Sequence, residues 1–160
     1  GRLDALPGPG GSGGTSFDPS GATTSAPAVP ADGLADLEVD GLATRERDRI
    51  AVAIWHHVDD QYARLPDADV TVELRGLPFD PARARVRHWR IDDTHSNAHA
   101  VWQHMGRPQD PTDEQLRTLK AHQGLEEGPA VDASASGKDI LRVRLPLPLH
   151  AISLLEVEPG

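Results

Sequence analysis

Polar and apolar residues alternate along two stretches of the chain with the period of two that a β-strand requires. Residues 69–77 would place three apolar side chains on one face of a strand, namely Val70, Val72 and Leu74. Residues 139–147 repeat this pattern with Leu141, Val143 and Leu145. We therefore predict two strands that are each buried on one face and solvated on the other.

A third stretch, residues 49–58, is apolar at most positions and rich in β-branched residues. This composition is typical of a central strand covered on both faces, so Trp55 in its middle is expected in the core. Further short runs separated by turn signals complete a set of seven predicted strands: residues 39–43, 84–91, 130–134 and 151–158. Pro146 and Pro148 separate the last two strands, because proline is tolerated only at an edge or a bend of a sheet.

One helix is well signalled in the sequence. Thr112 stands three residues before Gln115, which forms a capping box, and Gly124 follows as a stop signal. The helix is expected at about 111–123, between the fourth and fifth predicted strands. The predicted fold class is therefore mainly β, an antiparallel β-sandwich of about seven strands with one inserted short α-helix.

Composition divides the chain near residue 36. Residues 1–36 are rich in Gly, Pro, Ser, Thr and Ala and have no apolar periodicity, so they are predicted to be a flexible linker or loop. Residues 37–160 carry all the predicted strands and form the predicted β-sandwich domain.

The charge balance excludes several function classes. The formal net charge is -9, which argues against nucleic-acid binding because that depends on clustered positive charge. The chain has no cysteine, which excludes disulfides and thiolate zinc sites. No apolar run approaches the ~20 residues of a membrane span, and we expect no membrane partner. The sequence leaves the compartment open.

The most distinctive part of the chain is residues 90–126, which read RIDDTHSNAHAVWQHMGRPQDPTDEQLRTLKAHQGLE. They are preceded by LATRERDRIAVAIWHHVDD and VTVELRGLP and followed by LRVRLPLPLHAISLLEVE. Together these stretches, over residues 38–158, resemble the C-terminal β-sandwich region that follows the catalytic barrel in glycoside hydrolase family 39. That family contains β-xylosidases and α-L-iduronidases.

The resemblance implies a sandwich detached from its barrel. Enzymes of the family are retaining glycosidases that hydrolyse O-glycosyl bonds with two glutamates ~5 Å apart, on a barrel that needs about 250 residues. No position here matches either glutamate, and Glu126 and Glu127 would point in opposite directions in an extended chain. We therefore expect a non-catalytic, cofactor-free module that is inactive alone and supports the (β/α)₈ barrel of the same parent chain.

The resemblance carries two further expectations. In the family the segment before the barrel contributes to the sandwich, so an unpaired strand edge is expected here. One expected role of this module is to mediate homo-oligomer contacts of the parent enzyme. Selection of the parent's substrate, whether a xyloside or a uronide, belongs to barrel loops outside this chain.

Within the matching stretch, seven residues are structural or interface candidates: Asp92, His95, Ser96, Asn97, Trp102, Gly106 and Pro108. The segment DDTHSN, residues 92–97, is typical of a turn whose side chains hydrogen-bond to their own backbone. We expect it to tie a long connection to the sheet or to the missing barrel.

The histidines also allow a metal hypothesis. His95 and His99 are four residues apart, which on a helix would put both rings on one face at zinc-binding spacing. His104 would face elsewhere, and an aspartate at 92 or 93 would have to supply a third ligand. A small metal-dependent enzyme is therefore the least favoured function, and we predict no catalytic residue and no metal ligand.

Aspartate pairs raise calcium as a second metal hypothesis. Asp59–Asp60 and Asp92–Asp93 offer the hard oxygen ligands that calcium prefers. Paired aspartates at turns are more often solvated caps, so calcium is not part of the predicted function.

The three tryptophans are the residues on which a sugar-binding role would depend. Carbohydrate modules present exposed aromatic rings to sugars, but aromatic residues make up only 4% of this chain. Trp89 shares its strand face with arginines and is the candidate for sugar stacking, with stacking by Arg85 or Arg87 as the alternative. An independent carbohydrate-binding module with an oligosaccharide partner is the alternative function.

Overall fold

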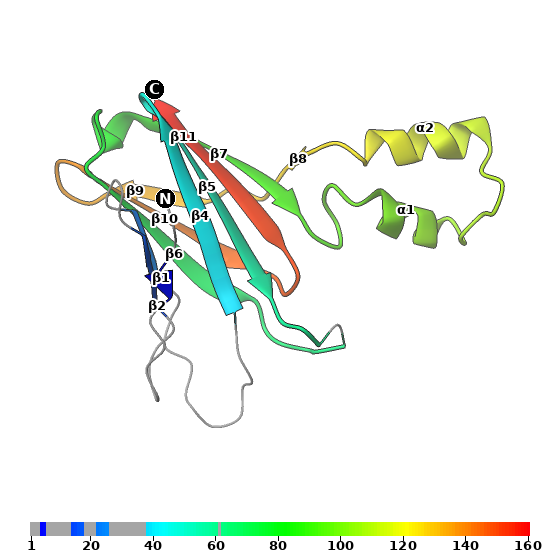
Figure 1. Ribbon diagram of the computed structural model, residues 1–160. Helices are drawn as coiled ribbons and strands as arrows, with labels where there is room; N and C mark the ends of the chain where they lie inside the picture. The colour runs from blue at the N-terminus through cyan, green and yellow to red at the C-terminus, as the bar shows by residue number, and fades with distance from the viewer. Residues whose placement is uncertain (1–3, 6–13, 18–21, 26–37, 61) are drawn as a thin grey trace.

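In the computed structural model, which describes residues 4–5, 14–17, 22–25, 38–60 and 62–160, the chain forms two packed antiparallel sheets (Figure 1). Sheet A has the strand order β1-β2-β3-β6-β10-β9, and sheet B has the order β4-β5-β11-β7-β8. The mainly β antiparallel sandwich that the alternation predicted is confirmed.

All seven predicted strands are present. They are β4 (Glu38–Glu46), β5 (Arg49–His57), β6 (Ala68–Arg75), β7 (Ala84–Ile91), β9 (Asp132–Ala135), β10 (Ile140–Leu147) and β11 (Ile152–Pro159). Four shorter strands add to them: β1 (Asp4–Ala5), β2 (Gly14–Phe17), β3 (Ala22–Ser25) and β8 (Glu126–Glu127). A 3-10 turn, Pro81–Arg83, precedes β7.

Three of the added strands lie in the segment that composition predicted as a linker or loop. β1, β2 and β3 extend sheet A outward from β6, and β3 pairs with β6 in antiparallel register. The rest of residues 1–36 lies outside the described residues, so the predicted boundary near residue 36 stays a prediction.

The core lies between the two sheets, where alternate residues of their central strands meet. The six inward positions predicted on β6 and β10 are each no more than 2% exposed. Sheet B contributes Ile50, Val52, Ile54, Leu155 and Val157 from β5 and β11. Burial of these aliphatic side chains is the main source of stability, at about 25 cal/mol per Å² of apolar surface.

The central strand β5 differs from its prediction. Its buried positions are Ile50, Val52, Ile54 and His56, so Trp55 points to the opposite, outer face of sheet B and is only partly buried. The expectation that β5 is covered on both faces, with Trp55 in the core, is therefore wrong for this chain. The sequence makes both faces of β5 apolar, but among the described residues only the inner face is packed.

Pro146 occupies a place in β10 where its missing N–H does no harm. Pro146 is opposite Asp69 of β6, whereas β9 on the other side of β10 pairs only as far as Arg144. Proline is tolerated at such a local edge. The expectation of an edge or bend is confirmed, and the carbonyl of Pro146 is used by a buried arginine described below.

Between β7 and β8 the chain leaves the sandwich as a helical arm, residues 96–125, which projects from the sheet edge (Figure 1). Its second helix, α2 (Asp113–Ala121), is the predicted one, and the capping box between Thr112 and Gln115 is formed. Its first helix, α1 (Ala98–His104), corrects the prediction of a single helix. No residue of α1 or α2, both of which are described in full, is completely buried.

None of the helices among the described residues is long and apolar enough to cross a membrane.

Candidate functional interface

The carboxylate of Asp92 organises the turn by which the chain leaves β7. One of its oxygens, Oδ1, accepts hydrogen bonds from the backbone N–H groups of Thr94 (2.7 Å) and His95 (2.8 Å) and contacts the Nδ1 of His95 at 3.0 Å. Burial by itself raises the pKa of Asp92, but the hydrogen bonds from His95 and Thr94 outweigh it and hold the pKa at about 2. Asp92 is therefore a carboxylate anion at neutral pH.

A buried arginine faces this carboxylate from β7. Arg90 is 2% exposed, and its Nη1 lies 3.7 Å from Oδ2 of Asp92. Its Nη2 donates a 2.8 Å hydrogen bond to the carbonyl of Pro146 on β10. A buried cation requires such partners, since desolvation would otherwise outweigh its attractions. Arg90 thus links both sheets to the base of the arm.

Ser96 joins the outgoing and returning ends of the arm. Its hydroxyl donates to the carbonyl of Arg90 (2.6 Å) and accepts the backbone N–H of Glu126 (2.8 Å). Asn97 donates to the carbonyl of Asp92 (3.0 Å) and caps α1 by accepting the N–H of Ala100 (2.9 Å). We call Arg90, Asp92, His95, Ser96, Asn97 and Glu126 the root of the arm.

The other three predicted interface residues lie within the arm, away from the root. Trp102 donates from Nε1 to the carbonyl of Pro108 at 3.0 Å, and the ring of His99 stacks on it at a centroid distance of 5.6 Å. Gly106 has a φ of 84°, which favours glycine at the turn after α1. These contacts hold the arm together internally, and a role in an interface stays a prediction for all seven residues.

The helical pairing of His95 and His99 that the metal hypothesis required is not formed. α1 begins at Ala98, so His95 lies in the turn before it, while His99 stacks on Trp102. His104, the last residue of α1, has its Nδ1 on the carbonyl of Ala100 at 2.7 Å. No group of three or more His, Asp or Glu side chains placed to hold a metal ion occurs among the residues that the structure describes.

A second buried polar group, missed by the sequence reasoning, lies next to Arg90. His88 donates from Nδ1 to the carbonyl of Pro129 (2.7 Å), so its Nε2 accepts from the hydroxyl of Ser153 (3.1 Å). Burial lowers the pKa of His88. Ser153 is completely buried, so this serine–histidine pair has no access to a substrate. Alternation on β7 could have found His88, whereas Ser153 carries no signal.

The outer face of sheet B carries an exposed apolar surface. Ile152 of β11 lies opposite Trp55 on one side and Ile91 on the other. In the next row Leu154 lies opposite Ala53 and Trp89, and Leu42 also lies opposite Ala53. Leu42, Ile91 and Ile152 remain 41–42% exposed. We call Leu42, Ala53, Trp55, Ile91, Ile152 and Leu154 the apolar face.

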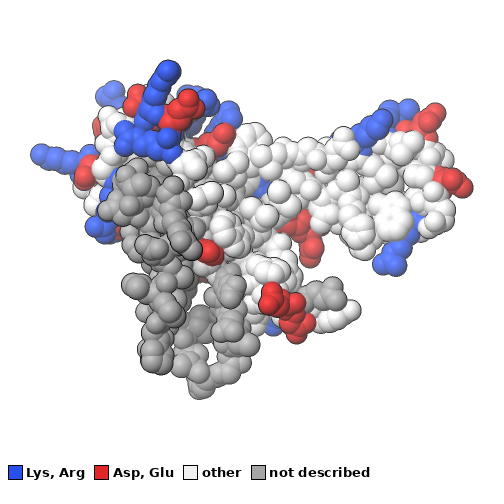
Figure 2. All heavy atoms as spheres, viewed as in Figure 1, with Lys and Arg blue, Asp and Glu red and all other residues white. Residues whose placement is uncertain are grey.

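Figure 2 shows this side of the molecule: the charges gather at one end of sheet B, and a largely uncharged surface runs from its middle toward the arm. A contiguous exposed apolar surface on an otherwise charged protein marks an interaction site. The apolar face is therefore the strongest candidate for an interface on this side.

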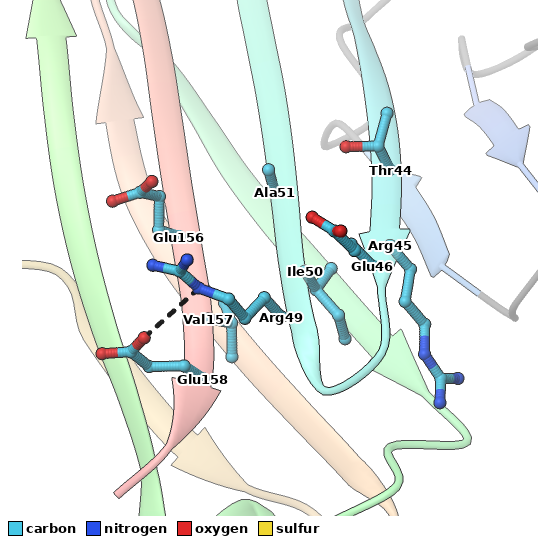
Figure 3. Close-up of a pocket in the computed structure, with 9 residues that line it drawn as sticks. All are labelled: Thr44, Arg45, Glu46, Arg49, Ile50, Ala51, Glu156, Val157 and Glu158. Carbon is cyan, nitrogen blue, oxygen red and sulfur yellow. Dashed lines mark ion pairs between the residues drawn. The ribbon is translucent and has the colours of Figure 1, made fainter.

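The charged end of the same sheet is internally paired. Arg87 lies 2.9 Å from Glu156, while Arg49 and Arg85 approach Glu158 at 3.6 Å and 3.9 Å. Figure 3 shows Arg49 reaching toward Glu158 beside a shallow pocket of about 260 Å³ between β4, β5 and β11. Each of these three arginines is therefore held by one of two glutamates in an exposed ion pair, and such pairs contribute little individually.

Trp89, the candidate for sugar stacking, lies between the apolar face and the charged end of sheet B. Its Nε1 donates to Glu156 at 2.9 Å, and the guanidinium of Arg87 lies 5.3 Å from its ring centroid. Stacking by Arg87 was one of the alternatives from the sequence, and this geometry is a cation–π contact. The ring face toward Arg87 is already occupied, and sugar binding by Trp89 stays a prediction.

Comparison with known proteins gives concordant matches. Residues 32–139 match the model of the glycosyl hydrolases family 39. The α-L-iduronidase of Canis lupus familiaris is 34% identical over 119 residues, and that of Homo sapiens is 30% identical over 116 residues. The alignments cover 69% and 70% of this chain but 17% and 18% of the relatives, so the chain spans less than a fifth of their length.

Solved structures show the same fold. The GH39 enzyme from Xanthomonas axonopodis pv. citri aligns with a TM-score of 0.60 at 15% identity, over 75% of this chain and 26% of that chain. A GH39 β-xylosidase from Caulobacter crescentus aligns with a TM-score of 0.51 at 23% identity, over 73% and 22% of the two chains. At these identities the likeness establishes the fold alone.

Proposed function

This chain belongs to glycosyl hydrolase family 39, and we propose that it is the non-catalytic β-sandwich module that packs against and supports the catalytic barrel of its parent enzyme. The alignments cover only 17% and 18% of the relatives, so the barrel and the activity of a retaining glycosidase are proposed for the parent and not for this chain. The observation that carries the proposal is the apolar face.

The central strand supports this reading in a specific way. β5 has the sequence of a strand covered on both faces, yet its outer residues, among them Ala53 and Trp55, are only partly buried. Interfaces between domains of one chain leave such a surface when the partner is removed. A barrel packed on the apolar face would bury the outer side of β5, as the apolar sequence of this strand predicts.

The arm and the free strand edge fit the same role. The root fixes the arm at the end of β7, next to Ile91 of the apolar face, so that the arm can reach past the sheet toward a neighbouring domain. β4 is the outermost strand of sheet B and pairs with β5 alone among the described strands. This matches the unpaired edge that the resemblance implies.

The two glutamates at the end of the arm favour a structural role. Glu126 and Glu127 follow each other along β8 and do not form a facing carboxylate pair. Hydrogen bonds from the backbone of Ser96 and from His122 lower the pKa of Glu126, which suits an ion-pair partner and not a general acid. Glu126 Oε1 lies 2.8 Å from His122 Nδ1, so it is used within the chain.

Hydroxyl-radical footprinting tests the proposal directly by comparing the isolated chain with the full-length parent enzyme. We expect Trp55, Ile91 and Ile152 to react in the isolated chain and to be protected in the parent. Tyr62, which is 80% exposed and lies away from β5–β11 pairing, is the internal control and should react in both. Equal labelling of the apolar face in both proteins would overturn the docking proposal.

Substitution in the parent gives a second, independent test. Ile152→Glu should lower the thermal stability of the parent and weaken its glycosidase activity, while leaving the isolated chain folded. Ser134→Glu, at an exposed position of β9 in sheet A, is the control away from the apolar face and should change neither property. An unaffected Ile152→Glu parent would contradict the proposed contact.

A further inference from the structure

Two histidine rings meet at the end of sheet B, apart from the root of the arm. His57 is the last residue of β5, and His150 lies in the turn between β10 and β11. Their Nδ1 atoms are 3.4 Å apart, and their ring centroids are 5.4 Å apart. This separation is long for a hydrogen bond, since N–H···O bonds in proteins are most often about 2.9–3.0 Å.

The backbone holds the two rings in place. His150 donates its N–H to the carbonyl of His56 at 2.7 Å, and His56 donates its N–H to the carbonyl of Ala151 at 3.1 Å. These two main-chain hydrogen bonds fasten the turn to the end of β5. His150 has a φ of 60°, a left-handed conformation in which histidine is among the enriched non-glycine residues. The fold therefore places the backbone of positions 57 and 150 side by side.

A carboxylate lies on the far side of His57. Oδ1 of Asp59 is 3.6 Å from Nε2 of His57. Histidines that bind metals usually direct their second ring nitrogen to a carboxylate or carbonyl, which leaves the first nitrogen with a free lone pair. In that tautomer the lone pair of His57 Nδ1 points toward His150.

There is also room for an ion with its bound waters. A cavity of about 270 Å³ opens at this position and is lined by Trp55, His56, His57, His150, Ala151 and Ile152. Its opening to solvent leaves coordination positions for water beside the two rings.

We propose that His57 and His150 bind one divalent transition-metal ion of the zinc, nickel and copper group through their Nδ1 atoms. Two nitrogens that each bind zinc at ~2.0–2.1 Å with a tetrahedral angle lie about 3.4 Å apart, which is the separation observed here. Neutral imidazole suits these ions, whereas calcium and magnesium require oxygen ligands. Both ligands belong to this chain, but the cavity shares Trp55 and Ile152 with the apolar face, so the site is tested on the isolated chain, where that face is uncovered.

Isothermal titration of the chain with nickel chloride, and separately with zinc sulfate, tests the site. We expect one ion per chain, with an affinity that falls at least tenfold in His57→Ala and in His150→Asn. Asparagine tolerates the left-handed backbone at position 150, so this variant removes the ligand without straining the turn. Asp59→Asn should weaken binding less than either ligand variant.

His104→Ala is the matched control, because His104 is an exposed histidine in the arm with its ring on the carbonyl of Ala100. It should bind the ion as the unaltered chain does. Thermal unfolding should show that the ion raises the melting temperature of the unaltered chain and of His104→Ala but not of the ligand variants. Quenching of tryptophan fluorescence by nickel should follow the same pattern, since Trp55 lines the cavity.

Three outcomes would overturn the proposal. The first is no binding of either ion at millimolar concentration, which would leave the pair as a weak histidine–histidine contact. The second is unchanged affinity in both ligand variants. The third is an equal loss of affinity in His104→Ala, which would assign the binding to histidines elsewhere.

Discussion

Ile152 and Trp55 lie directly opposite each other on β11 and β5, on the face of sheet B that is turned away from the core. On the inner face of the same two strands, Leu155 and Ile54 are completely buried. One pair of strands thus presents two apolar surfaces, and only the inner one is packed within the described residues.

This difference predicts unequal effects of substitution along a single strand. Leu155→Ala should lower the free energy of unfolding of the isolated chain by about 2–5 kcal/mol, because it leaves a cavity in the core. Ile152→Ala should lower it by less than about 1 kcal/mol, because the side chain is already half in water. Urea unfolding of the two variants measures the difference. Similar losses would mean that the outer face is packed in solution.

The depressed pKa of Asp92 predicts a loss of stability in acid. Its pKa in the folded chain is about 2, below the ordinary aspartate value of 3.8. A carboxylate with a lowered folded pKa stabilises the fold above its unfolded pKa, and this contribution disappears as the pH falls toward the folded pKa. We expect about 2 kcal/mol at neutral pH, lost between about pH 4 and pH 2.

The variant Asp92→Asn isolates this contribution. It should be less stable than the unaltered chain near pH 7, and the difference should shrink as the pH is lowered to about 2. Denaturant unfolding at several pH values is the measurement. A deficit that is the same at both ends of the range would assign the effect to packing and not to the charge.

Two glycines near the end of the arm give a matched pair. A Cβ at Gly128 would lie 2.7 Å from ring atoms of His88 and 2.9 Å from Cβ of Arg90, whereas a Cβ at Gly124 would meet nothing within 4 Å. Gly128→Ala should cost about 1–3 kcal/mol through overpacking. Gly124→Ala should stay within about 0.5 kcal/mol of the unaltered chain. Circular dichroism during thermal unfolding compares them, and equal stability would show that the His88 ring moves aside freely.

The carbohydrate-binding alternative makes an opposite prediction to the docking proposal. The guanidinium of Arg87 already covers one face of the Trp89 ring, and Glu156 accepts a hydrogen bond from its Nε1. We therefore expect no change in tryptophan fluorescence when xylo-oligosaccharides are added to the chain at up to millimolar concentration. The same titration of Arg87→Ala shows whether uncovering the ring creates a site. A saturable change in the unaltered chain would favour a binding module.

The strands could be predicted because their side chains obey one simple constraint. On β6 and β10 every second residue enters the core, so alternation fixes both the strand and its buried face. The capping box of α2 is equally local, since it involves only Thr112 and Gln115. Such features need no knowledge of what the rest of the chain does.

The root of the arm could be predicted only in part. The turn-forming composition of residues 92–97 is visible in the sequence, but alternation alone does not predict that a charged residue such as Arg90 is buried. Its burial depends on Asp92 and on the carbonyl of Pro146, 56 positions away in the sequence. Likewise α1 depends on its cap at Asn97, and the seven residues after that cap carry no clear apolar stripe.

The hydroxyl of Ser96 accepts the N–H of Glu126 and donates to the carbonyl of Arg90, so it closes the 29-residue loop that lies between Ser96 and Glu126. The ladders that join β7 to β11 and to β8 end before this loop begins. The loop can therefore be exchanged, lengthened or reduced to a short turn without removing a rung from either sheet.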